Sequence, residues 1–133
     1  RRILSDRIRD CHGDLRLEHI FWGKEIAIFD CVEFNERFRY TDVAADIGFL
    51  AMDLDYHGRD DLSEHLIRTY IEKSEDRELS LLLDFYKCYR AYVRGKVESF
   101  RLDDPHIPEA EKRGALNRAK NYFDLAWRYA LKF

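Results

Sequence analysis

Three polar side chains near the start of the chain have the types and spacing that phosphoryl transfer requires. Asp14 follows Gly13 in a polar stretch, His19 comes five residues later, and Asp30 closes an apolar run. This chemistry needs a carboxylate that accepts a proton from, or orients, the attacking hydroxyl, and further ligands for the magnesium ion that neutralises the phosphates. The pattern predicts that Asp14 is the catalytic carboxylate and that Asp30 is a metal ligand.

A loop and a hairpin must bring these side chains together. A loop over residues 10–16 can aim several side chains at one point from a rigid scaffold. Two short apolar runs follow it and meet at Gly23 and Lys24, which is a hairpin signal. We expect this hairpin to return Asp30 toward Asp14.

The residues around Asp14 also resemble a known family. The run His12-Gly13-Asp14-Leu15 resembles the catalytic loop of protein-kinase-like enzymes in the form used by aminoglycoside and choline phosphotransferases. Asp30 falls where those families carry their second metal-binding Asp. Further segments look closest to bacterial proteins that join this domain to a P-loop kinase domain. These segments are residues 29–35, 40–43, 49–54 and 86–97, and residues 41–48 resemble the Gly-Asp-x-x-x-Asp-Leu-Ala run that follows the second Asp in the phosphotransferase families.

The resemblance implies an ATP- and Mg²⁺-dependent phosphotransferase that acts on a small hydroxyl-bearing molecule. It implies catalytic-loop roles for Asp14 and His12, the latter holding the loop by hydrogen bonds. It also implies that Asp46 braces this loop as a buried acceptor, where the plain alternative is a surface carboxylate. Metal binding falls to Asp30 and to His19, which replaces the family's usual Asn. Because a neutral imidazole suits zinc and other transition metals better than magnesium, either Asp30 carries the ion with water, or the site is weakened.

Length and composition predict one domain over residues 1–133, with the catalytic loop and hairpin in residues 1–40 and a helical bundle in residues 41–133. A net charge of −3 argues against the basic excess of nucleic-acid-binding proteins. No stretch approaches the roughly 20 apolar residues that a membrane span needs, and no leader is visible. The three cysteines show no Cys-x-x-Cys spacing, which favours reduced thiols. We therefore expect a cytoplasmic protein that binds neither nucleic acid nor membrane.

A kinase-like enzyme needs parts that this chain does not contain. A Gly-rich loop must cover the phosphates and a strand must carry a lysine, but the six glycines here are scattered. The chain begins at Arg1 without Met and ends at Phe133 inside a helical pattern. We therefore expect a fragment, the C-terminal lobe of a kinase-like fold. Its partners would include the missing N-terminal lobe, with a following P-loop kinase domain as a further candidate.

Helical periodicity predicts a mainly α fold with this one small hairpin. Thr41 is expected to cap a helix that ends at Gly58, and further helices should cover about residues 62–72, residues 77–100 and the chain after Pro108. The helix over residues 77–100 should bury one apolar stripe and expose one basic face. The stripe comprises Leu79, Leu82, Tyr86, Tyr89, Val93 and Val97, and the face comprises Lys87, Arg90 and Arg94. The basic face is either simply solvated or in contact with an anionic substrate.

Two functions of other classes stay open at this stage. A decayed site would leave a helical interaction or scaffold module, which the replacement at His19 suggests. Alternatively, a mixed cluster of His and Asp side chains could form a transition-metal phosphohydrolase centre that activates water. That centre would comprise His12, Asp14, His19 and Asp30. The acceptor is open too, because an acidic group could attract a cationic aminoglycoside, whereas the basic face favours an anion. The acidic group comprises Asp53, Asp55, Asp60 and Asp61.

Overall fold

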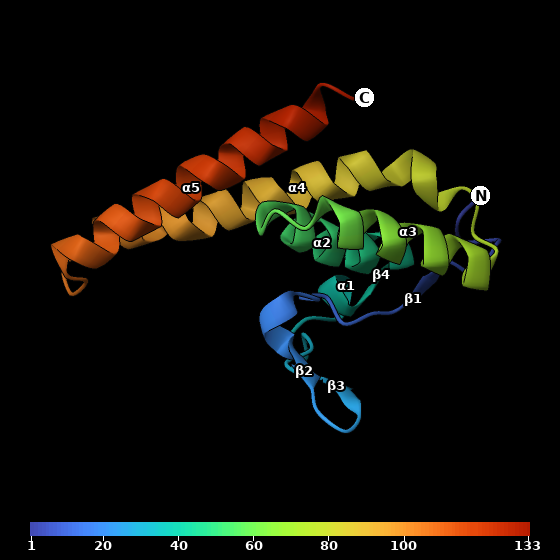
Figure 1. The fold of residues 1–133 in the computed structure, drawn as a ribbon. Helices are drawn as coiled ribbons and strands as arrows, with labels where there is room; N and C mark the ends of the chain where they lie inside the picture. The colour runs from blue at the N-terminus through green and yellow to red at the C-terminus, as the bar shows by residue number, and fades with distance from the viewer.

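The computed structural model describes all residues from 1 to 133 and is mainly α-helical with a small hairpin, as the sequence predicts (Figure 1). The helices are α1 (Glu36–Arg39), α2 (Val43–Tyr56), α3 (Asp60–Ser74), α4 (Leu79–Phe100) and α5 (Glu109–Ala130). The strands are β1 (Ile8–Asp10), β2 (Ile20–Trp22), β3 (Ile26–Ile28) and β4 (Tyr40–Asp42). None of the helices combines the length and the hydropathy that a membrane crossing requires.

Helix α4 is the central element of the helical body. Figure 1 shows α4 and α5 as a long antiparallel pair, with α2 and α3 beneath α4. The β2–β3 hairpin projects below α2, on the side away from α4 and α5. One core cluster lies between α2, α4 and α5 and includes Phe49, Met52 and Tyr122. A second joins α2 to the start of α4 through Ile47 and Leu83. The body is thus held together by helix faces that lie far apart in the sequence.

Two glycines let the helices approach closely. A Cβ atom on Gly48 of α2 would lie 2.8 Å from the Cβ of Tyr86 on α4. A Cβ atom on Gly95 of α4 would lie 2.7 Å from the ring of Phe123 on α5. Both distances are shorter than real Cβ contacts, so a larger side chain at Gly48 would push α2 away from α4, and one at Gly95 would displace the Phe123 ring.

The buried stripe of α4 differs from the one predicted. Its buried positions are Leu79, Leu83, Lys87, Ala91, Gly95 and Glu98, whereas Tyr89 and Val97 are exposed. Because α4 packs between α2 and α5, its most buried line carries small residues at the crossings, and large rings lie at the edges. The prediction of a solvated basic face is also wrong for Lys87, because its Nζ lies 2.6 Å from the Asp55 carboxylate inside the helical body.

Helix α2 starts one residue later than expected. Asp42, not Thr41, caps α2, and its carboxylate accepts a hydrogen bond of 2.9 Å from the N–H of Ala44. At the other end Gly58 adopts a φ of +74° just beyond the helix, as expected for a glycine that ends it. The remaining predicted helices are present, with α3 beginning at Asp60 and α4 at Leu79.

An arginine near the start of the chain joins the N-terminal segment to β4 and to the connection between α3 and α4. The Arg2 guanidinium donates two hydrogen bonds of 2.7 and 2.6 Å to Asp42, and others of 2.6 and 2.9 Å to Asp76. Both carboxylates are buried. Burial by itself raises the pKa of Asp42, but the hydrogen bonds from Arg2 and from the Ala44 N–H outweigh it and hold that pKa below its ordinary value.

Candidate functional site

The loop that carries Asp14 is fixed to helix α2 by a single carboxylate. The backbone N–H groups of His12 and Gly13 donate hydrogen bonds of 2.7 and 2.9 Å to the two oxygens of Asp46. Bonds from N–H groups to an ionised carboxylate are among the stronger ones in proteins. This confirms the prediction that Asp46 braces the loop and excludes the plain surface carboxylate.

The conformation of the loop requires glycine at position 13. Gly13 has a φ of +86°, and a Cβ atom there would lie 2.9 Å from Val32 and 3.2 Å from the backbone oxygen of Phe38. The loop is also tied to the segment after the hairpin, because the N–H of Val32 donates a 2.8 Å hydrogen bond to the oxygen of His12. Its shape is therefore set from two sides.

His12 uses both ring nitrogens inside the loop. Its Nε2 lies 2.5 Å from the backbone oxygen of Phe29, and its Nδ1 accepts a 3.1 Å hydrogen bond from the N–H of Asp14. A carbonyl oxygen can only accept, so this pairing assigns the proton to Nε2 and leaves the ring neutral. His12 thereby connects the hairpin to the residue that the sequence predicts as catalytic, as expected of a positioning residue.

The three groups of the predicted phosphoryl-transfer site converge on His19. Its Nδ1 lies 3.6 Å from the Asp14 carboxylate, and its Nε2 lies 3.8 Å from the Asp30 carboxylate. The same Nδ1 lies 2.9 Å from the backbone oxygen of Asp14, so a proton on Nδ1 is donated to this oxygen. His19 itself is only 8% exposed. Each of the two carboxylates therefore lies near a different ring nitrogen of His19.

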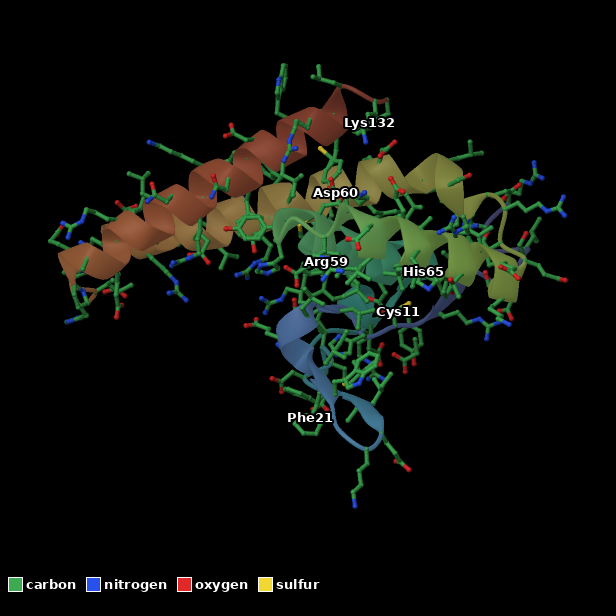
Figure 2. The ribbon with its side chains drawn as sticks, in the orientation of Figure 1. Cys11, Phe21, Arg59, Asp60, His65 and Lys132 are labelled. Atoms are coloured by element: carbon green, nitrogen blue, oxygen red, sulfur yellow. The ribbon has the colours of Figure 1, made fainter.

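Figure 2 labels Cys11 and Phe21, which lie before and after the Asp14 loop in the sequence. Cys11 marks the point where β1 leads into the loop, at the edge of the helical body, and Phe21 extends from the hairpin on the outside. Asp30, in the turn after β3, adopts a φ of +55°. The hairpin register, with Phe21 opposite Ala27, brings Asp30 back beside the loop as predicted.

Sequence reasoning missed one partner of the candidate catalytic carboxylate. Asp14 accepts hydrogen bonds of 2.9 and 3.2 Å from the guanidinium of Arg16. Arg16 also pairs with Glu18. Burial alone lowers the pKa of Arg16, but the pairing with Asp14 outweighs it and keeps the guanidinium charged. The only signal in the sequence was a basic residue two positions after the aspartate.

A second carboxylate of α2 holds the far end of the loop. The N–H of Leu17 donates a 2.8 Å hydrogen bond to Asp53, which is buried. Asp55 in turn pairs with Lys87 and accepts a hydrogen bond from the hydroxyl of Tyr129. Two of the four acids considered as an aminoglycoside-binding group are thus already engaged inside the fold.

No group of three or more His, Cys, Asp or Glu side chains lies close enough together to hold a metal ion by itself. The four-residue hydrolase centre considered from the sequence therefore gains no support. Asp30 and His19 form a pair that can contribute at most two ligands.

Comparison with known proteins gives relatives but no family. No family model matches the chain, and no solved structure matches it. The chain is 44% identical over 110 residues to the uncharacterized protein Rv2004c of Mycobacterium tuberculosis and to the uncharacterized protein Mb2027c of Mycobacterium bovis. The match covers 82% of this chain but only 22% of each relative. The chain thus spans about a fifth of the length of the curated relatives it matches.

Proposed function

We propose that this chain is the catalytic-loop lobe of an ATP-dependent phosphotransferase that acts on the hydroxyl group of a small molecule. The observation that carries the proposal is the convergence of the Asp14 and Asp30 carboxylates on His19, in a loop braced by Asp46. Phosphoryl transfer depends mainly on positioning and on charge stabilisation, and a loop with this many fixed contacts can supply both.

In this proposal Asp14 handles the proton of the acceptor. As the hydroxyl oxygen of the acceptor forms its bond to the γ-phosphorus of ATP, its proton passes to the Asp14 carboxylate. The bond from that phosphorus to the bridging oxygen breaks, and ADP leaves with the electron pair. The Asp14 side chain is half-buried, so an acceptor can reach it, and the hydrogen bonds from Arg16 fix its orientation.

The site offers two groups that would help to hold a divalent ion beside the phosphates. Asp30 Oδ2 and His19 Nε2 are 3.8 Å apart, whereas adjacent ligands of an octahedral magnesium ion lie about 3 Å apart, so one of the two side chains would have to move for both to bind the ion. Magnesium in such enzymes is commonly held by one or two carboxylates together with the substrate phosphates, so Asp30 with water and phosphate oxygens would be sufficient.

The rest of the enzyme would lie outside this chain. The proposal requires an N-terminal lobe with a Gly-rich loop and a strand lysine, and a P-loop kinase domain stays a candidate partner. The curated relatives are much longer than the matched segment, which is 22% of their length. A cytoplasmic location is part of the same proposal.

The direct test is Asp14→Asn in the longer protein that contains this chain. The assay measures the rate of ADP formation with an acceptor identified by screening hydroxyl-bearing metabolites. General acid–base catalysis typically contributes about 10²–10⁴-fold, so this rate should fall by that factor. The helical circular dichroism signal should stay unchanged. Asp103→Asn, which changes an exposed carboxylate beyond the end of α4, is the matched control and should retain full activity. An Asp14→Asn variant with full activity would falsify the assigned role.

The replacement of Asn by His19 gives a second test. His19→Asn restores an amide oxygen, which suits magnesium better than imidazole does, so the magnesium-dependent rate should be preserved or raised. The rate with Mg²⁺ and with Mn²⁺ should be measured for both proteins. A clear loss with both ions would show that His19 is a required ligand or support and would contradict the expectation.

A scaffold without catalysis is the second candidate. It is favoured by the ion pair between Asp14 and Arg16, which engages the carboxylate that should face an acceptor, and by the replacement at His19. The two functions separate in one experiment with the longer protein. Binding of ATP–Mg²⁺ without phosphoryl transfer to any acceptor would support the scaffold.

A further inference from the structure

A cavity of about 470 Å³ opens directly beside the Asp14 carboxylate. Its walls come from the catalytic loop, from the segment between the hairpin and α2, and from one face of α4. The volume lies within the range of roughly 300–1,000 Å³ that is usual for small-molecule sites. A molecule bound here could place a hydroxyl group at Asp14.

The charged residues of the cavity favour a negatively charged occupant. Two arginines, Arg37 and Arg90, line it, and Asp14 is its only carboxylate. Asp14 is already paired with Arg16, whereas neither Arg37 nor Arg90 has a carboxylate within 4.0 Å. Arg37 is exposed to solvent, whereas Arg90 is half-buried. An anion bound at Arg90 would supply the partner that this guanidinium lacks.

The guanidinium of Arg90 packs against two aromatic rings. Its guanidinium carbon lies 4.6 Å from the centre of the Phe49 ring and 5.6 Å from that of Tyr89. Its Nε is buried without a hydrogen-bond partner, and burial lowers its pKa. A desolvated charge without a partner is costly, and the planar fork of an arginine matches a carboxylate or a phosphate through two parallel hydrogen bonds.

Aromatic rings form the mouth of the cavity. Phe34, Phe38 and Tyr89 line it and are 83%, 56% and 49% exposed. The rings of Phe34 and Phe38 meet edge to face at 6.1 Å. Exposed rings around a polar centre can cover the flat apolar part of a ligand, because aromatic faces bury much area in a fixed geometry.

We propose that the acceptor is a small hydroxy acid whose hydroxyl group lies at Asp14, whose carboxylate or phosphate binds Arg90, and whose apolar part packs against Phe34 and Phe38. The role of the hydroxyl rests on the proposed function, whereas the preference for an anion rests on the cavity alone. Cationic acceptors such as aminoglycosides are disfavoured by the same two arginines.

The test uses three probes of similar size that carry a negative, a neutral and a positive group on the same hydroxymethyl-substituted ring: 4-(hydroxymethyl)benzoate, 4-(hydroxymethyl)benzamide and 4-(hydroxymethyl)benzylamine. Their affinities for the 133-residue chain are measured by NMR titration, with the Arg90 Nε–H signal reporting the place of binding. The benzoate should bind about tenfold more tightly than the amide, as expected for a charge-assisted pair, and the ammonium probe should bind most weakly. Equal affinities, or tighter binding of the ammonium probe, would overturn the inference.

Variants assign the preference to the arginines. Arg90→Met keeps the aliphatic stem and should abolish the tenfold preference, and Arg37→Met, at an exposed position that cannot disturb the core, should reduce it about threefold. Lys96→Met changes an exposed lysine on the same helix outside the cavity and should leave it intact. If both arginine variants fold and both keep the full preference for the benzoate, the inference is overturned. If only Arg37→Met folds, an undiminished preference in that variant overturns it as well.

Transfer assays with the longer protein separate this inference from the proposed function. If the benzoate binds preferentially but phosphate reaches no hydroxyl compound, the function fails and the anion preference stands. If phosphate is transferred to the ammonium probe faster than to the benzoate, the function stands and the inference is overturned.

Discussion

Replacing the carboxylate that holds the loop should destabilise the whole chain measurably. In Asp46→Ala the N–H groups of His12 and Gly13 lose hydrogen bonds of 2.7 and 2.9 Å. Hydrogen bonds to charged groups contribute roughly 1.5–3 kcal/mol each, and because Asp46 is half-buried water replaces part of them. The lost helix-dipole interaction, about 0.3–1 kcal/mol, is offset by the better helix propensity of alanine. The expected loss is therefore about 3 kcal/mol.

Urea unfolding followed by circular dichroism measures this loss. With a slope of about 2 kcal/mol per molar urea, a change of about 3 kcal/mol moves the midpoint by about 1.5 M. Asp61→Ala is the control, because Asp61 also lies in the first turn of a helix but is exposed and pairs with Arg59. Amide hydrogen exchange of His12 and Gly13 should be slow in the parent chain and fast in Asp46→Ala. Equal midpoints for the two variants would refute the reasoning.

Three further predictions concern other parts of the structure. Gly13→Ala places a Cβ atom on a residue with a φ of +86°, at 2.9 Å from the Val32 side chain. The free energy of unfolding, measured by thermal or urea unfolding, should therefore fall by about 2–3 kcal/mol. An unchanged midpoint would contradict the strained geometry. Burial and the nearby Asp46 raise the pKa of the Cys11 thiol to about 11. At pH 8 iodoacetamide should therefore modify Cys11 far more slowly than the exposed Cys31, which peptide mapping by mass spectrometry measures. Equal rates for the two thiols would contradict this. Because the pKa of Asp42 is lowered in the folded state, the stability it contributes is complete above about pH 4 and is lost as the pH falls through that lowered pKa. Unfolding titrations in acid should therefore show a steeper loss in the parent chain than in Arg2→Met, and parallel curves would speak against the Arg2 bonds as the cause.

The parts of the site that were predictable depend on short spacings. The turn at Gly23 and Lys24 fixes a hairpin, and the hairpin fixes where Asp30 returns, so its approach to His19 followed from local rules. The bracing role of Asp46 followed from the family resemblance and is confirmed by its two hydrogen bonds.

The parts that were not predictable depend on partners far away in the sequence. A periodic pattern cannot show that Lys87 of α4 meets Asp55 of α2, so a buried ion pair was interpreted as a solvated face. The pairing of buried Glu98 on α4 with Arg118 on α5, at a distance of 3.1 Å, likewise joins partners far apart in the sequence. Tyr89 was assigned to the core because its spacing fits, whereas the crossing of α4 with its neighbours leaves it at the mouth of the cavity.

Helix α2 anchors the loop that carries Asp14. Both carboxylates that fix the loop, Asp46 and Asp53, belong to it, and its opposite side touches α4 where Gly48 meets Tyr86. A methyl group at Gly48 would lie 2.8 Å from the Cβ of Tyr86, so the helix would have to shift and the loop would travel with it. A substitution at Gly48 should therefore change the position of Asp14 although Gly48 does not touch the loop.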